Sequence, residues 1–226
     1  MPSPVVTFDV GQTIVELDID FLAARLRERG HEVAPHALAE AAPIAWQRYD
    51  ELVDVGASHP WHELMTVLMT RAGIAEPGAL VEWLYTQQAQ HNLWRRPIPP
   101  MVELVRELRD RGVVTAALSN SEGHLQELLE EIELAPLFKA IVDSGRVGIA
   151  KPDARLFAHT VEVLGVEPSV IVHIGDSWAA DVEGALGAGW NAIWYRSRQG
   201  VGSRDARVPI AHDAAETRAA LKTFGI

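Results

Sequence analysis

The chain has 226 residues, 48% of them hydrophobic, which suffices for one large domain or for a domain that carries a smaller insertion. Its net charge of −11 is spread along the chain, and it contains no cysteine, so we expect no nucleic-acid partner, no disulfide bonds and no thiolate chemistry. It also lacks the roughly 18-residue apolar stretch of a membrane span and a basic, then apolar, leader, so we expect a cytoplasmic protein without a membrane partner.

The first predicted element is a strand at residues 5–8, an apolar run that ends at the carboxylate of Asp9. After it, residues 17–96 carry no strand signal. They consist of amphipathic runs, such as IDFLAARLRERG and WHELMTVLMTRAG, which predict helices. The prolines of residues 95–100 close this region. The sequence therefore predicts an all-helical domain at residues 17–96, inserted into a core domain formed by residues 1–16 and 97–226.

The rest of the core alternates between predicted helices and strands. Residues 101–112 form an amphipathic run that ends in glycine, as a helix does. Further strands are predicted where short apolar runs are flanked by turn residues, at 113–118, 140–142, 170–174 and 192–195. Such alternation is typical of a parallel sheet covered on both faces. We therefore predict an α/β fold with a Rossmann-like parallel-sheet core.

Polar side chains follow the apolar runs of three predicted strands. They are Asp9, Ser119 with Asn120, and Asp176, and Lys151 directly precedes a predicted helix. Ligands of an open α/β sheet bind outside the carboxyl ends of its strands, so we expect these groups to converge. An aspartate can attack phosphorus, a divalent cation between two carboxylates offsets their repulsion, and hydroxyl and ammonium groups hold phosphate oxygens. The set favours phosphoryl transfer.

Four motifs in this order resemble those of the haloacid dehalogenase-like (HAD) hydrolase superfamily. They are FDVGQTI at 8–14, LSNSEG at 118–123, AKPDARLF at 150–157 and HIGDSWAADVEGALGAG at 173–189. An isolated SN dipeptide carries no information, but all four motifs in order are a specific signal. The resemblance covers the whole sheet domain, and the helical insertion resembles the cap domain of that family.

The resemblance implies a phosphatase mechanism for a small phosphorylated substrate. Asp9 would be the nucleophile that forms an aspartyl phosphate, and Ser119 and Lys151 would hold the phosphate. Three neighbouring residues are expected to contact the substrate: Gln12, Thr13 and Asn120.

The resemblance also implies a Mg²⁺ site. Its protein ligands would be the carboxylates of Asp9 and Asp176 and the main-chain carbonyl of Gly11. Asp181 would support these ligands from one shell further out, although an acid near a helix start can also serve only as a cap.

Gly11 is the departure from the family pattern. Phosphatases of this family usually carry an aspartate two residues after the nucleophile, which protonates the leaving group and then activates water. Acid–base help of this kind is worth about 100- to 10,000-fold in rate. Two interpretations stay open: a phosphohydrolase that is slow on alkyl phosphates, and a catalytically weak or silent protein that binds a phosphorylated ligand or a protein partner. Glycine could also be present because the turn needs a positive φ.

Two related chemistries are disfavoured by the sequence. Phosphonate hydrolases of the superfamily use a cap lysine, but residues 17–100 contain no lysine. Haloacid dehalogenases need no metal, whereas the acidic GDSWAAD motif is intact here. Within the insertion, His59 and His62 could be ligands or substrate contacts, although such a pair more often marks a helix start. We also expect the insertion to move about hinges near residues 15–17 and 96–100.

Overall fold

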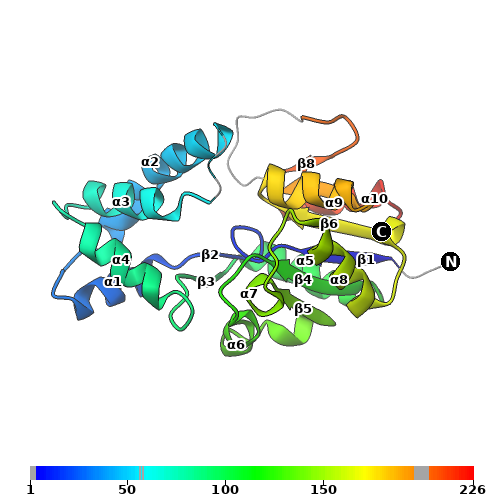
Figure 1. The fold of residues 1–226 in the computed structure, drawn as a ribbon, viewed down its shortest axis with the longest axis horizontal. Coiled ribbons are helices and arrows are strands. Elements are labelled where there is room, and N and C mark those ends of the chain that lie inside the picture. Colours follow the sequence, from blue (N-terminus) through cyan, green and yellow to red (C-terminus); the bar gives the residue numbers. More distant parts are fainter. Residues whose placement is uncertain (1–3, 56, 58, 196–203) are drawn as a thin grey trace. The chain divides into compact units, whose positions relative to one another are not determined.

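The computed structural model describes residues 4–55, 57, 59–195 and 204–226. The chain divides into two compact units, and each is described by itself (Figure 1). The first consists of residues 1–16 and 94–226, and the second of residues 17–93.

A six-stranded parallel sheet forms the centre of the first unit (Figure 1). Its order is β5-β4-β1-β6-β7-β8. The strands are β1 (Val5–Phe8), β4 (Val114–Ser119), β5 (Ala140–Asp143), β6 (Ile171–Gly175), β7 (Asn191–Tyr195) and β8 (Ile210–Ala211). In register, Phe8 of β1 lies opposite Ala117 on one side and Ile174 on the other. The chain therefore leaves β1, β4 and β6 at the same sheet edge.

Helices cover both faces of this sheet, because successive strand side chains point to opposite faces. Val6 and Phe8 of β1 pack into one hydrophobic cluster, and Val5 packs into the other. The first cluster includes residues of α5 (Pro99–Asp110), α6 (Leu125–Glu131) and α10 (Ala214–Lys222). The second includes residues of α8 (Ala154–Leu164), a π-helical turn (Trp178–Glu183) and α9 (Gly184–Gly187). The predicted α/β parallel-sheet core is confirmed.

The second unit is helical between its ends. Its helices are α1 (Ile19–Glu28), α2 (Pro35–Asp54), α3 (Trp61–Arg71) and α4 (Gly78–Gln87). Asp18 begins α1, because its side chain accepts a hydrogen bond from the main-chain N–H of Phe21. The unit has its own apolar interior, which includes Leu22, Leu64 and Leu68, all buried. None of the described helices combines the length and apolar character needed to cross a membrane.

Short elements differ from the sequence prediction. No strand was expected between residues 17 and 96, but β2 (Val15–Leu17) and β3 (Trp94–Pro97) form a two-stranded sheet. The β3 segment reads Trp-Arg-Arg-Pro and lacks the alternating pattern by which a strand is recognised. Residues 94–97 belong to the first unit and not to the helical unit. The sequence prediction also omitted β8 and α10.

Candidate functional site

Asp9 lies directly after β1, where its carboxylate is buried against two neighbouring segments. Its main-chain N–H donates to Ile174 O at 2.8 Å, which continues the sheet by one residue. Ser119, the last residue of β4, donates its hydroxyl to Asp9 Oδ1 at 3.0 Å. Lys151 Nζ donates to the same oxygen at 2.8 Å. The structure thus brings Asp9 together with Ser119 and Lys151, which follow it in the chain by 110 and 142 positions.

Lys151 is held by three acceptors and has a side chain that is only 2% exposed. Besides Asp9, its ammonium group contacts Asp181 Oδ1 at 2.7 Å and the main-chain oxygen of Leu118 at 2.7 Å. Its main chain is also fixed, because Asn120 Oδ1 accepts from Lys151 N at 2.8 Å and Asn120 Nδ2 donates to Lys151 O at 3.0 Å. The side-chain amide of Asn120 therefore binds both main-chain polar atoms of Lys151, its N–H and its carbonyl oxygen.

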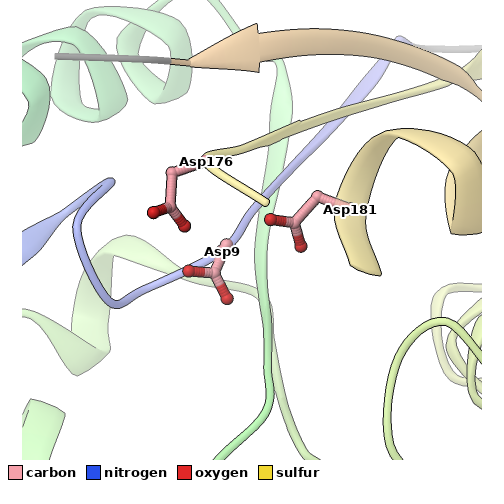
Figure 2. A group of neighbouring side chains, drawn as sticks. All are labelled: Asp9, Asp176 and Asp181. Carbon is pink, nitrogen blue, oxygen red and sulfur yellow. The ribbon is translucent and has the colours of Figure 1, made fainter. Parts of the chain in front are cut away.

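Three carboxylates gather at this sheet edge: Asp9, Asp176 and Asp181 (Figure 2). Each offers an oxygen, and these oxygens all lie within 4.8 Å of one another. Asp176 follows β6 and is half-buried, whereas Asp181 lies in the π-helical turn and is 2% exposed. Lys151 supplies one positive charge to this group. The remaining negative charge and the oxygen ligands fit a hard divalent cation such as Mg²⁺.

Burial and charge shift the pKa values of the three paired groups. Burial raises the pKa of Asp9 and the charge of Asp181 adds to the increase. Lys151 opposes this effect, but the pKa of Asp9 stays above its ordinary value. Burial lowers the pKa of Lys151, but Asp181 and Asp9 together outweigh it and leave the pKa above its ordinary value. Burial raises the pKa of Asp181, and Lys151 and His173 outweigh it and bring the pKa below its ordinary value. Lys151 is therefore charged and is shared by two carboxylates.

The Gly11 backbone does not require glycine, which corrects one explanation for its presence. Its φ lies outside the left-handed region, and the positive φ belongs to Gln12, at 57°. A Cβ on Gly11 would lie 3.7 Å from Trp94 Cδ1 and 4.0 Å from Asp9 Oδ2, which are ordinary contacts. Next to it, Gln12 Nε2 and Thr13 Oγ1 are buried and have no hydrogen-bond partner among the described residues.

Four residues that the sequence analysis did not assign support the site. Trp194 Nε1 donates to the main-chain oxygen of Asp176 at 2.9 Å and so anchors the loop after β6. His173 Nε2 lies 3.2 Å from Asp181 Oδ1, and its Nδ1 lies 2.9 Å from Thr7 Oγ1. A Cβ on Gly175 would lie 2.3 Å from Asp181 Cγ, so only glycine allows that carboxylate to pack there. The sequence feature that could have pointed to His173 is the presence of a histidine within the apolar run of β6.

The histidine pair of the helical unit has other contacts. His59 Nδ1 lies 3.1 Å from the Tyr49 hydroxyl, and His62 Nε2 lies 3.3 Å from Glu82. Within the described residues, neither histidine belongs to a cluster of three groups that could hold a metal ion.

Comparisons with known proteins find several proteins that are similar to this chain. A family model for haloacid dehalogenase-like hydrolases matches residues 4–189. The chain is 28% identical to haloacid dehalogenase-like hydrolase domain-containing protein 3 of Bos taurus, over 83% of this chain and 79% of that protein. It is 27% identical to glyceraldehyde 3-phosphate phosphatase of Methanopyrus kandleri, over 84% and 83%. A magnesium-bound HAD-hydrolase of Bacillus subtilis, in which interdomain movement was found, has a TM-score of 0.71 at 20% identity and covers 98% and 99% of the two chains.

The ion pairs of Lys151 generate a stability prediction. Lys151→Met leaves two buried carboxylates facing each other without a cation, and removing one partner of a buried pair costs about 3–5 kcal/mol. We expect a loss of that size in the free energy of unfolding, measured by urea denaturation at neutral pH without divalent metal. Lys139→Met is the matched control, because Lys139 is exposed. Equal, small losses in both variants would show that the buried ion pairs contribute little.

Proposed function

Because the chain belongs to the haloacid dehalogenase-like hydrolase family, we propose that it is a Mg²⁺-dependent phosphohydrolase that acts on a small phosphorylated molecule. The observation that carries the proposal is the environment of the buried Asp9 carboxylate. Ser119 and Lys151 both donate hydrogen bonds to it, and an oxygen of the Asp176 carboxylate lies within 4.8 Å of it. The site thus combines a nucleophile, two donors for phosphate oxygens and an oxygen-ligand set for a divalent cation. The phosphatase relative supports the substrate class.

Catalysis would proceed in two steps. A carboxylate oxygen of Asp9 forms a bond to phosphorus, and the bond from phosphorus to the leaving oxygen breaks. Ser119 and Lys151 donate to the phosphate oxygens and stabilise their charge. Water then attacks the phosphorus of the aspartyl phosphate, which releases inorganic phosphate and regenerates the carboxylate.

The metal site would use residues already close to the nucleophile. Asp9, Asp176 and the main-chain carbonyl of Gly11 would hold Mg²⁺, and Asp181 would act on them through Lys151 and the surrounding loop. When bound, Mg²⁺ supplies positive charge that offsets the repulsion between Asp9 and the phosphate. Glycine at position 11 does not remove this ligand, because every residue has a main-chain carbonyl.

The helical unit, residues 17–93, would serve as a cap that selects the substrate and moves to close the site. Closing an active site expels water and completes the pocket. Its connections to the first unit lie at β2 and β3, next to the hinge regions expected from the sequence. Gln12 and Thr13 support a substrate contact near Asp9, since each carries a buried polar atom that a ligand could satisfy.

Gly11 favours a second candidate function, a protein that binds a phosphorylated ligand or a protein partner with little or no turnover. No side chain at this position can donate a proton to the leaving oxygen or activate water. The buried Asp9, Ser119 and Lys151 cluster would bind a phosphate in either case.

A turnover assay decides between the two candidates. We expect Mg²⁺-dependent release of phenolate from an aryl phosphate, abolished in Asp9→Asn because an amide is a poor nucleophile. Asp176→Asn should need a higher Mg²⁺ concentration for half-maximal rate and bind Mg²⁺ more weakly by calorimetry. Asp110→Asn, at the exposed end of α5, is the control and should behave as wild type. Folded wild-type protein without Mg²⁺-dependent turnover would contradict the hydrolase proposal.

The backbone at Gly11 makes the missing acid testable by restoring it. The Cβ of an aspartate at position 11 would meet only ordinary contacts, so we expect the Gly11→Asp variant to fold. In the wild type, aryl or acyl phosphates should outperform alkyl phosphates and give a burst of leaving group before slow turnover, because leaving-group departure and water attack both lack acid–base help. In the variant, the slow phase should speed up, by at most about 100- to 10,000-fold.

Gly11→Asn is the matched control, since it has the same size but cannot transfer protons in the same way. The asparagine variant should keep the wild-type rates on alkyl and aryl phosphates. A folded aspartate variant whose rates equal those of the asparagine variant on both substrates would contradict this account and favour the non-catalytic interpretation.

A further inference from the structure

His173 is a buried polar residue in a strand that is otherwise apolar. It lies within β6, where every residue is buried, and has no exposed surface. Its Nδ1 lies 2.9 Å from Thr7 Oγ1, and its Nε2 lies 3.2 Å from Asp181 Oδ1. A buried polar group costs free energy unless it is hydrogen-bonded, and here both ring nitrogens have a partner.

The direction of these hydrogen bonds follows from Asp181. Its carboxylate is paired with the Lys151 ammonium group and can only accept, so His173 Nε2 carries a proton and donates to it. In the neutral ring Nδ1 then carries no proton and accepts from the hydroxyl of Thr7, which is also fully buried.

Asp181 is fixed at both carboxylate oxygens. Oδ1 accepts hydrogen bonds from His173 Nε2, at 3.2 Å, and from Lys151 Nζ, at 2.7 Å. Oδ2 accepts from the main-chain N–H of Ser177 at 2.8 Å. The absent side chain of Gly175 lets this carboxylate lie against the end of β6. With this orientation, Oδ1 faces the ammonium group that also contacts Asp9 at 2.8 Å.

We propose that His173 is a positioning residue: through Asp181 it holds the Lys151 ammonium group against Asp9. A continuous buried chain of polar contacts runs from Thr7 through His173, Asp181 and Lys151 to the nucleophile. Its kinetic consequence rests on the phosphohydrolase function proposed above, whereas its geometric consequence does not. Misplacing a phosphate-holding group by about 1 Å can cost on the order of 100-fold in rate.

The competing explanation is that His173 only fills the core. Its ring makes edge contacts with Phe157 and Trp190, each with 6.3 Å between ring centroids. If packing were its whole role, an apolar residue of similar size would replace it. Two variants therefore separate the explanations: His173→Leu removes both hydrogen bonds, and His173→Gln keeps an amide N–H near the Nε2 position and an oxygen that can accept from Thr7.

The kinetic arm compares these variants on an aryl phosphate with saturating Mg²⁺. We expect His173→Leu to lower kcat about 10- to 100-fold with little change in KM, and His173→Gln to recover most of the loss. Thermal melting of each variant is recorded alongside. Wild-type kcat in the leucine variant, or equal kcat losses in both variants, would overturn the proposal and leave His173 a packing residue.

A second arm needs no turnover and is measured on the metal-free protein by NMR. An ammonium group held by three acceptors exchanges slowly with water, so the Lys151 side-chain signal should be visible in wild type and in His173→Gln, and lost in His173→Leu. Thr7→Val should shift the His173 ring nitrogen signals. Thr160→Val is the control, because the Thr160 hydroxyl, also buried, bonds to Leu156 O within α8.

The two arms separate the two proposals. If wild type shows no turnover, the phosphohydrolase function fails while the NMR comparison still decides the role of His173. A Lys151 signal retained equally in all three proteins would overturn the positioning role whatever the activity.

Discussion

The shared ammonium group of Lys151 is the interaction on which the site depends. It lies 2.8 Å from Asp9 Oδ1 and 2.7 Å from Asp181 Oδ1, and its own side chain is only 2% exposed. One cation between two carboxylates holds together segments that leave β1 and β6 and precede α8. Breaking a buried pair exposes each remaining charge to a large desolvation penalty, so these three segments are bound to one geometry. Two neighbouring features stabilise the same arrangement. The Asn120 side-chain amide holds the main chain of Lys151, and the lack of a side chain at Gly175 leaves room for the Asp181 carboxylate.

Much of the fold follows from the sequence because its signals are local. Apolar runs of four to six residues predicted β1 and β4, and the rule that ligands bind at the carboxyl ends of parallel strands predicted that Asp9, Ser119 and Asp176 converge. Among the elements that were not predicted, β3 and β8 are too short or too polar to show a period. The pairing of Thr7 with His173 could not be predicted, because the two lie 166 positions apart and each resembles an ordinary strand residue.

With glycine at position 11, this site keeps the groups that would bind phosphate and metal but lacks the side chain for acid–base catalysis. The groups that would hold a phosphate and a cation are side chains at other positions and the main-chain carbonyl of Gly11, which does not depend on a side chain. The group that would move protons is a single side chain, and it is absent. Since the φ of Gly11 lies outside the left-handed region and a Cβ there would make only ordinary contacts, neither strain nor a clash accounts for glycine. The expected consequence is a site that favours good leaving groups and retains its covalent intermediate longer.

The central claim is that Asp9 carries the phosphoryl group during turnover. The most direct measurement is rapid acid quenching of the protein with Mg²⁺ and an aryl phosphate, followed by peptide mass spectrometry. The account predicts one phosphoryl group on the peptide that contains Asp9, removed by hydroxylamine as an acyl phosphate should be and missing in Asp9→Asn. Turnover without a phosphorylated peptide, or with the phosphoryl group on another residue, would contradict it.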